Sequence, residues 1–209
     1  MDSYLSLIDE LVKEGVLYTK EIIEAFRFVH RKFFLPDGIG QNAGVNAPLP
    51  LGYGQTISQP YTVAFMLELL CPEKGQKIMD IGYGSGWTSA LLAHIVGDAG
   101  KVYAIEIVPE LAEFGKTNIA KFGFLQKGIV QTFCQDGSQG LADYAPFDRI
   151  IAAASASDLP DAWLTQLASG GRLVAPVGQS IFLVEQKGPG RIEKTEFSGF
   201  LFVPLLRTK

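Results

Sequence analysis

The chain has 209 residues, a length that suits one domain, and 47% of them are apolar while 19% are charged. This balance is typical of a globular protein and excludes a disordered chain, which needs fewer apolar residues and a higher net charge. The formal net charge of -4 gives no general basic field for nucleic acid. The acidic first residues differ from a secretory signal, no apolar run is long enough to span a membrane, and Cys71 and Cys134 lack metal-binding spacing. We therefore expect a cytoplasmic protein without a metal site.

The first third of the chain is expected to be mostly helical. Apolar residues recur at helical spacing through residues 3–29, and a second helical pattern runs from about residue 59 to residue 70. Between them, residues 36–54 are rich in Gly, Pro, Asn and Gln, which predicts a long loop. The stretch "GYGQTISQP" leads from this loop into the helix, and Ser58 stands where a capping residue precedes a helix.

From residue 77 onward, predicted strands and helices alternate. The expected strands are 77–82, 101–107, 128–136, 147–155 and 170–178, and the expected helices are 87–96, 109–123 and 159–169. Two further strands, 180–188 and 197–206, follow without a helix between them. The alternation predicts a doubly wound α/β fold with a mostly parallel sheet, and the final strands predict an antiparallel edge. We treat residues 1–209 as one domain, in which 1–75 form a helical extension with a loop and 76–209 form the α/β core.

The ends of the first three predicted strands carry acids and glycines. The turn in "MDIGYGSGW" follows an acid with three glycines at alternate positions: Asp80, Gly82, Gly84 and Gly86. Such glycines let the backbone approach a ligand at the carboxyl edge of a sheet. Glu106 ends the second strand, the position at which such folds bind ribose hydroxyls, and Asp136 ends the third. This combination favours a nucleotide-like cofactor over a chance set of polar loop residues.

Two kinds of cofactor use a turn of this type. The dinucleotide fingerprint G-x-G-x-x-G needs a glycine where Trp87 stands, which disfavours NAD. The spacing G-x-G-x-G after an acid matches instead the first motif of methyltransferases that depend on S-adenosylmethionine (SAM). An acid followed by glycine, as at Asp136 and Gly137, suits acceptance of a hydrogen bond from an adenine amino group.

Four segments of the chain together resemble the protein-L-isoaspartate O-methyltransferase family. They are "PLPLGYGQTISQPY" (48–61), "APFDRII" (145–151), "GGRLVAPVG" (170–178) and "FVPL" (202–205). The resemblance covers nearly the whole chain, and the first segment is its most specific part. It implies a seven-stranded, Rossmann-like SAM methyltransferase fold and a protein-L-isoaspartate (D-aspartate) O-methyltransferase. Such an enzyme methylates the free carboxylate of L-isoaspartyl residues in damaged proteins or peptides, which starts repair through a succinimide. We expect those peptides or proteins as partners, and neither nucleic acid nor membrane.

The resemblance also implies which residues form the site. In the family the loop lies over the cofactor and the isoaspartyl side chain, and its serine, here Ser58, is the catalytic residue. Substrate contacts are expected from Thr56, Ser58, Val203 and Leu205. Cofactor contacts are expected from Gln55, Thr56, Ile57, Ser58, Asp80, Gly82, Gly84, Ser85, Gly86, Glu106, Asp136 and Gly137.

The chain departs from the family pattern at several positions on the substrate side. Gly44 and Asn46 stand where the family usually has Tyr and Asp, Ala153 where Thr is common, and His30 where Pro is typical. A SAM-dependent methyltransferase with a different acceptor, and a non-catalytic SAM-binding module, therefore stay open as alternatives. His30 and His94 are both expected to be structural, because a carboxylate nucleophile is already ionised and needs no strong base.

Overall fold

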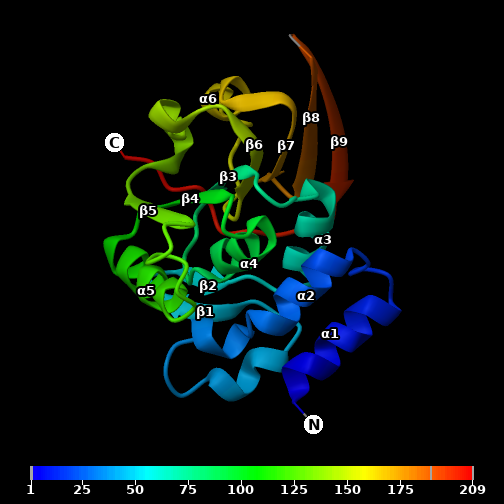
Figure 1. Cartoon of the computed structure of the whole chain (residues 1–209), viewed down its shortest axis with the longest axis vertical. Helices are drawn as coiled ribbons and strands as arrows, with labels where there is room; N and C mark the ends of the chain where they lie inside the picture. Colours follow the sequence, from blue (N-terminus) through cyan, green and yellow to red (C-terminus); the bar gives the residue numbers. More distant parts are fainter. Residues whose placement is uncertain (1, 189, 209) are drawn as a thin grey trace.

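The fold is built around a seven-stranded sheet, which in Figure 1 crosses the view with most of the helices below it. The computed structural model describes residues 2–188 and 190–208. The strand order is β5-β4-β3-β6-β7-β8-β9, and the first five of these run parallel. Their bounds are β3 (Lys77–Ile81), β4 (Lys101–Glu106), β5 (Val130–Cys134), β6 (Phe147–Ala152) and β7 (Leu167–Val177). The antiparallel edge consists of β8 (Ser180–Gly188) and β9 (Arg191–Ser198). The predicted fold class is confirmed.

The order of the strands places a ligand site at one edge of this sheet. From β3 the chain adds β4 and β5 on one side, and then β6 and β7 on the other. Ligands of open α/β sheets bind at the carboxyl ends of the strands, beside such a reversal. The Gly-rich turn follows β3 directly, so the sequence motif lies at this position.

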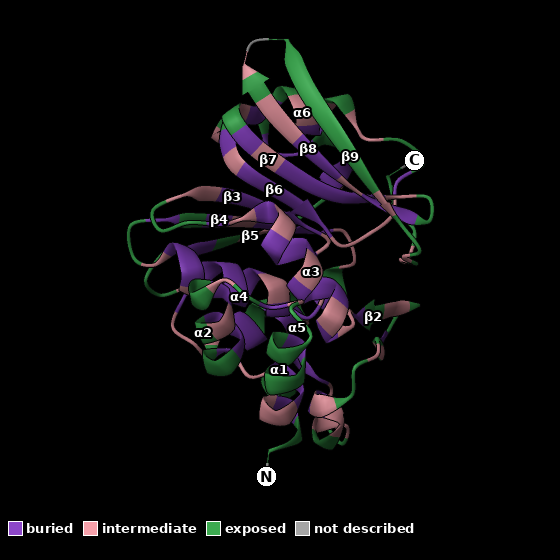
Figure 2. Ribbon diagram, turned by 90° about the vertical axis from the view of Figure 1, so that its right-hand side faces the viewer, coloured by how far each residue is buried: buried purple, intermediate pink, exposed green. Residues whose placement is uncertain are grey.

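Helices cover the two faces of the sheet unequally. One face is covered by α3 (Pro60–Leu70), α4 (Trp87–Val96) and α5 (Pro109–Ala120), with α1 (Ser3–Lys13) and α2 (Lys20–Phe28) packed outside them, as Figure 2 shows. The other face carries the short α6 (Asp161–Thr165). The helix expected over 159–169 is therefore too long, because β7 already begins at Leu167. None of the helices in the described ranges has the length and apolar character needed to cross a bilayer.

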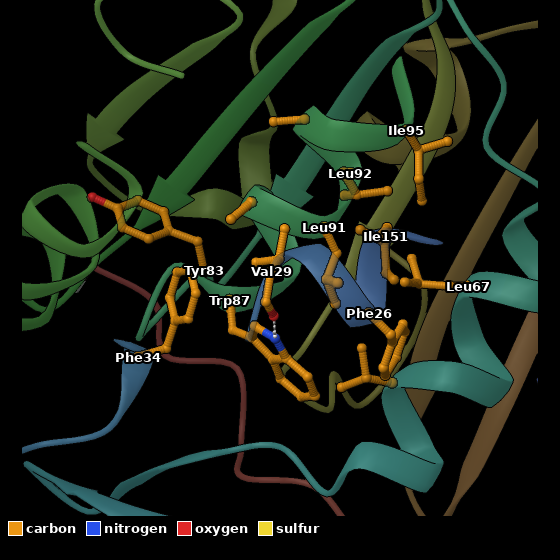
Figure 3. Close-up of a cluster of buried hydrophobic side chains, with 14 of the residues drawn as sticks. Phe26, Val29, Phe34, Leu67, Tyr83, Trp87, Leu91, Leu92, Ile95 and Ile151 are labelled. Atoms are coloured by element: carbon orange, nitrogen blue, oxygen red, sulfur yellow. Dashed lines mark hydrogen bonds between the residues drawn. The ribbon is translucent and has the colours of Figure 1, made fainter. Parts of the chain in front are cut away.

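Trp87 joins the N-terminal helices to the Gly-rich turn. Its side chain is fully buried at the start of α4, and its indole N–H donates to the carbonyl oxygen of Val29 at 3.1 Å (Figure 3). The ring of Phe26 packs edge-on against it, with 5.5 Å between centroids. Removing a buried Trp side chain costs about 3–5 kcal/mol, so Trp87 contributes substantially to the stability of this part of the core.

Residues 36–54 contain more structure than the predicted long loop. A 3-10 turn, η2 (Gly40–Gly44), is followed by a hairpin of β1 (Leu49–Gly52) and β2 (Gln55–Ile57). Tyr53 and Gly54 form the hairpin turn with positive φ values of 54° and 70°. Gly44 packs so closely on α1 that a Cβ there would lie 2.5 Å from the carbonyl carbon of Ser3. A larger residue at position 44 would therefore clash with the start of α1.

The last predicted strand, 197–206, is wrong. The edge strand β9 ends at Ser198, and Gly199, with φ of 96°, turns the chain back across the carboxyl ends of the other strands. We call residues 199–208 the C-terminal strap. It is held by Ser155 just after β6, whose N–H donates to the carbonyl of Val203 and whose carbonyl accepts from Leu205, both at 2.8 Å. This local pairing replaces the ladder that an edge strand would have formed.

Candidate active site

A cavity opens at the carboxyl ends of β3, β4 and β6, between the β1–β2 hairpin and the C-terminal strap. It encloses about 730 Å³ of space, with open solvent at its mouth included. We call it the cofactor cavity. The expected site residues that line it are Gln55, Thr56, Ile57, Ser58, Gly82, Gly84, Ser85, Glu106, Gly137, Val203 and Leu205.

The Gly-rich turn forms the floor of the cofactor cavity and has the conformation that glycine permits. Gly82, Gly84 and Gly86 all have positive φ. A Cβ on Gly86 would lie 2.6 Å from the carbonyl oxygen of Gly115 in α5, so this glycine serves the packing of α4 on α5 and does not line the cavity. Gly84 is different, because a Cβ there would meet nothing closer than Leu51 at 3.7 Å. Its requirement is conformational.

Glu106 is fixed before any ligand arrives. The side chain is buried, Oε2 accepts from the N–H of Gly84 at 2.9 Å, and Oε1 accepts from the N–H of Val108 at 3.0 Å. Each carboxylate oxygen has a second lone-pair site, and the residue lines the cofactor cavity. The carboxylate is thus oriented by two backbone amides and retains acceptor capacity for a pair of hydroxyls.

Asp80, which we expected to contact the cofactor, lies under the turn and outside the cavity wall. It is fully buried, and Oδ2 accepts from the Ser89 hydroxyl at 2.5 Å. Its Oδ1 has no partner among the described residues. Burial raises the pKa of Asp80 to about 7, the nearby Glu106 adds to the rise, and the Ser89 hydrogen bond opposes it. Its contact with α4 makes it a support of the turn.

Asp136, the expected partner of an adenine amino group, points to the C-terminal strap instead. Its carboxylate accepts from the N–H of Ser138 at 2.8 Å and from the N–H and hydroxyl of Thr208 at 2.8 and 3.1 Å. Burial alone would raise the pKa of Asp136, but these hydrogen bonds outweigh it and hold the pKa below its ordinary value. Only the next residue, Gly137, lines the cofactor cavity.

Ser58 lies between β2 and α3 with its hydroxyl available. The helix begins at Pro60, its N-cap is Gln59, and no hydrogen bond from the Ser58 hydroxyl is found within the described part of the chain. The capping role that we expected for Ser58 is therefore wrong. The free N–H of Tyr61 is taken by the side-chain oxygen of Asn46 at 3.0 Å, so the residue that departs from the family pattern is the cap.

Arg31, which no sequence motif singled out, holds the Ser58 loop in place. It is fully buried, and its guanidinium donates to four backbone carbonyls, those of Ala43, Val45, Ala47 and Ser58, at 2.8–3.4 Å. The plane also lies 5.5 Å from the centroid of the Trp87 ring. Burial lowers the pKa of Arg31 to about 10, so it stays charged at neutral pH. Carbonyl dipoles, and not a carboxylate, offset the burial of its charge.

A second cavity continues from the cofactor cavity, and we call it the acceptor cavity. The two share Thr56, Ser58, Ala153 and Val203. The other residues lining it are uncharged too: Pro48, Gln59, Thr62, Leu201 and Phe202. Of the four expected substrate contacts, Thr56, Ser58 and Val203 line this space, whereas Leu205 lines only the cofactor cavity. Ala153, where the family usually has Thr, is the one substrate-side departure at the junction of the cavities.

Several further lining residues have only weak sequence signals. Ile107 directly follows Glu106, and Leu111 lies on the first turn of α5, where both offer apolar surface to a flat ring. Thr88 follows the Gly-rich motif by one residue, and Ala154 follows the end of β6 by two. Their position close to the ends of strands or to the Gly-rich turn is the only sequence signal that could have identified these residues. His30, which contacts Asp2 at 3.0 Å, and His94, which stacks on Phe28, line neither the cofactor cavity nor the acceptor cavity.

Comparisons with known proteins agree with this geometry. The model of the family described as protein-L-isoaspartate(D-aspartate) O-methyltransferase matches residues 3–209. Among curated relatives, the protein-L-isoaspartate O-methyltransferase of Aeropyrum pernix is 41% identical, with 98% of this chain and 80% of the relative covered. That of Pyrobaculum islandicum is also 41% identical, with 96% and 98% covered.

Solved structures share the fold across the chain. A Plasmodium falciparum protein in complex with S-adenosyl-L-homocysteine has a TM-score of 0.86 at 23% identity, covering 98% of this chain and 99% of its own. A structure of a protein-L-isoaspartate O-methyltransferase has a TM-score of 0.85 at 26% identity. The match covers 96% of this chain and 65% of that chain. With the site and the full-length match to the family model, the chain belongs to the protein-L-isoaspartate(D-aspartate) O-methyltransferase family.

Proposed function

We propose that this chain transfers a methyl group from SAM to the free carboxylate of L-isoaspartyl residues in damaged proteins or peptides. The observation that carries the proposal is the junction of two cavities at Thr56, Ser58, Ala153 and Val203. One cavity has the acid and glycines of a nucleotide site, and the other is lined by uncharged groups. Family membership supports the same reaction and the same cofactor.

The cofactor cavity has the features that SAM requires. Glu106 is placed for the ribose hydroxyls, Gly82 and Gly84 keep side chains out of the floor, and Ile107 and Leu111 line it with apolar surface. When bound, SAM supplies a methyl group on a sulfonium, which is an excellent leaving group. The protein itself therefore needs no strong base and no metal for this transfer.

The acceptor cavity suits a carboxylate that must keep its charge. A lysine or arginine would hold the anion more tightly but would lower its nucleophilicity, and a fully apolar site would raise its pKa until it took up a proton. The Ser58 and Thr56 hydroxyls are neutral donors, and the dipole of α3 favours an anion near its N-terminus. We assign Ser58 the role of aligning the carboxylate, with Arg31 holding the backbone of Ser58 from behind.

The direct experiment is a methylation assay with matched peptides. The protein is incubated with methyl-labelled SAM and with two peptides that differ only in carrying L-isoaspartyl or L-aspartyl at one position. We expect a base-labile methyl ester on the isoaspartyl peptide alone. Equal labelling of both peptides, or of neither, rejects the proposed acceptor. A SAM affinity measurement on the same sample then distinguishes a different acceptor from a chain that does not bind the cofactor.

We propose that this chain acts on isoaspartyl proteins in the cytoplasm. The unpaired thiols of Cys71 and Cys134 fit a reducing compartment. We propose protein and peptide substrates only, and the uncharged acceptor cavity supports this because nucleic acid would require a basic one.

A further inference from the structure

A third open space continues from the acceptor cavity along the outside of α3. It shares Pro48, Gln59, Thr62 and Leu201 with the acceptor cavity. Its remaining lining comes from the outer face of α3 and from the turn after β9: Tyr61, Phe65, Phe197, Ser198, Gly199 and Phe200. We call this space the aromatic groove. It encloses about 1420 Å³ of space with open solvent included.

The aromatic groove is preformed by stacked rings. The ring of Phe65 stacks on Phe200 with centroids 5.1 Å apart, meets Phe197 edge-on at 5.3 Å, and lies parallel to Tyr61 at 6.5 Å. Leu201, at the rim, is 82% exposed. Figure 2 shows α3 below the sheet, and α3 contacts β8. An apolar side chain entering the groove would therefore contact rings that are already in place.

The groove contains no charged residue among those that line it. An acidic or basic neighbour of the isoaspartyl residue would lose hydration there without gaining an ion pair. An aromatic or large aliphatic neighbour would bury apolar surface. The chemistry of the lining thus selects one class of peptide sequence.

We infer that the aromatic groove binds a side chain of the substrate chain that lies within two residues of the isoaspartyl site, and that it prefers aromatic or large aliphatic residues. The inference rests on the proposed function, because continuity with the acceptor cavity is what identifies the occupant. The groove begins where the acceptor cavity ends, so its occupant is a near neighbour of the isoaspartyl residue. Selection by this groove operates on top of recognition of the isoaspartyl group itself.

The test uses a peptide series on the full-length protein. The reference peptide carries one L-isoaspartyl residue in a background of Ala and Ser, and four variants place a single Phe at one of the two positions before or after it. We expect at least one Phe position to lower KM about tenfold relative to the reference, an effect of the size that a buried aromatic contact gives. The advantage is expected to persist at high salt, because the groove is uncharged.

Substitutions assign the effect to the groove. Phe200→Ala and, separately, Tyr61→Ala should bring KM for the favoured peptide to within about twofold of the reference, with kcat and the KM for SAM unchanged. Phe33→Ala, which removes an exposed ring outside the groove, is the matched control and should keep the preference. The circular dichroism melting curve of each variant shows that it is folded.

The outcomes separate the two levels of the proposal. A wild-type protein that methylates all five peptides with equal KM overturns the groove and leaves the proposed function intact, as does a preference that survives both groove substitutions. A wild-type protein that methylates none of the peptides overturns the proposed function and the groove with it. A dimer that dissociates in Phe200→Ala without a change in KM assigns the groove to a second copy of the chain and rejects the peptide.

Discussion

The guanidinium of Arg31 donates to the carbonyl oxygen of Ser58 at 3.0 Å, so a buried charge in the N-terminal region fixes the backbone of the proposed catalytic serine. Arg31→Lys retains the charge, but a single ammonium cannot span carbonyls from Ala43 to Ser58. We expect the free energy of unfolding to fall by about 3 kcal/mol and the Tm by about 6–12 °C. At a temperature where the variant is folded, kcat should fall about tenfold because the loop is no longer held.

Arg27→Lys is the control for this substitution. Arg27 donates instead to a carboxylate, that of Asp9, at 2.6 Å, and the two side chains are 47% and 64% exposed. An exposed ion pair contributes about 0.2–1 kcal/mol, so the Tm should hardly move. If Arg31→Lys and Arg27→Lys have the same Tm and kcat, the buried guanidinium does not organise the loop.

Ser58→Ala should separate chemistry from stability. Because the hydroxyl has no partner in the described chain, its removal should leave the Tm and SAM affinity nearly unchanged. If the hydroxyl aligns the charged acceptor, turnover should fall by about one to two decades, equivalent to roughly 1.5–3 kcal/mol. Single-turnover rates measure this directly. Asn46→Ala is the complementary variant, since loss of the α3 cap should lower stability by about 1 kcal/mol while the folded protein keeps its rate constant. A normal rate in Ser58→Ala would remove the serine from the mechanism.

Glu106→Ala should weaken SAM binding by about tenfold or more, because it deletes a charged acceptor that two backbone amides hold in position. The SAM affinity of Glu106→Gln should lie between those of the wild type and Glu106→Ala. Its amide has one oxygen in place of two, so it loses one of the two acceptors that now face the amides of Gly84 and Val108. Titration calorimetry with SAM measures the affinities. Glu110→Ala, an exposed acid four residues later, is the control and should bind as the wild type does. Unchanged affinity in a folded Glu106→Ala protein contradicts the ribose assignment.

Asp80 should make the stability depend on pH in the direction opposite to that of most acids. Its pKa is raised in the folded state, from 3.8 to about 7, so the folded protein binds this proton more tightly than the unfolded chain. The carboxyl is neutral in both states below pH ~4, and the folded state loses stability as the pH rises from about 4 to about 7. Above that range the loss is complete and amounts to about 4 kcal/mol.

Asp80→Asn removes this dependence while retaining the shape and a partner for Ser89. We expect the Tm of the variant to match the wild type near pH 4 and to exceed it by several degrees near pH 8. Asp98→Asn, an exposed residue paired with Lys127, should show no such divergence. Parallel curves of Tm against pH for wild type and Asp80→Asn across this range would show that burial does not raise the pKa of Asp80 as described.

The sequence predicted the central strands and the Gly-rich turn correctly. It failed for elements that lack a periodic apolar pattern. The strand–turn–helix around Gly82, Gly84 and Trp87 follows from glycine chemistry and apolar runs, and it is where we expected it. The edge strand β9 was missed because all its residues but one are exposed, so it has no apolar alternation. Its charged sequence protects an open sheet edge and resembles a loop.

Site residues were hard to predict where they act through distant contacts. Arg31 contacts carbonyls 12 to 27 residues away, and such carbonyls leave no trace in the sequence. Asp136 matches the motif at a strand end, but its carboxylate accepts from the backbone N–H of Thr208, 72 residues later. No sequence motif indicates that contact. Residue type and spacing therefore identified the cofactor edge, whereas tertiary packing decided which acid faces it.

Different residues of the C-terminal strap line the cofactor cavity and the aromatic groove. Val203, Pro204, Leu205 and Leu206 line the cofactor cavity, while Phe200 and Leu201 line the aromatic groove. A peptide in the groove would hold down the segment that covers the cofactor, so exchange of the cofactor would have to wait for the peptide to leave. We expect a compulsory order, with SAM binding first and the methylated peptide departing before S-adenosylhomocysteine. Initial-rate studies should then find S-adenosylhomocysteine competitive against SAM and mixed against peptide, and a random-order pattern would show that the strap opens freely beneath a bound substrate.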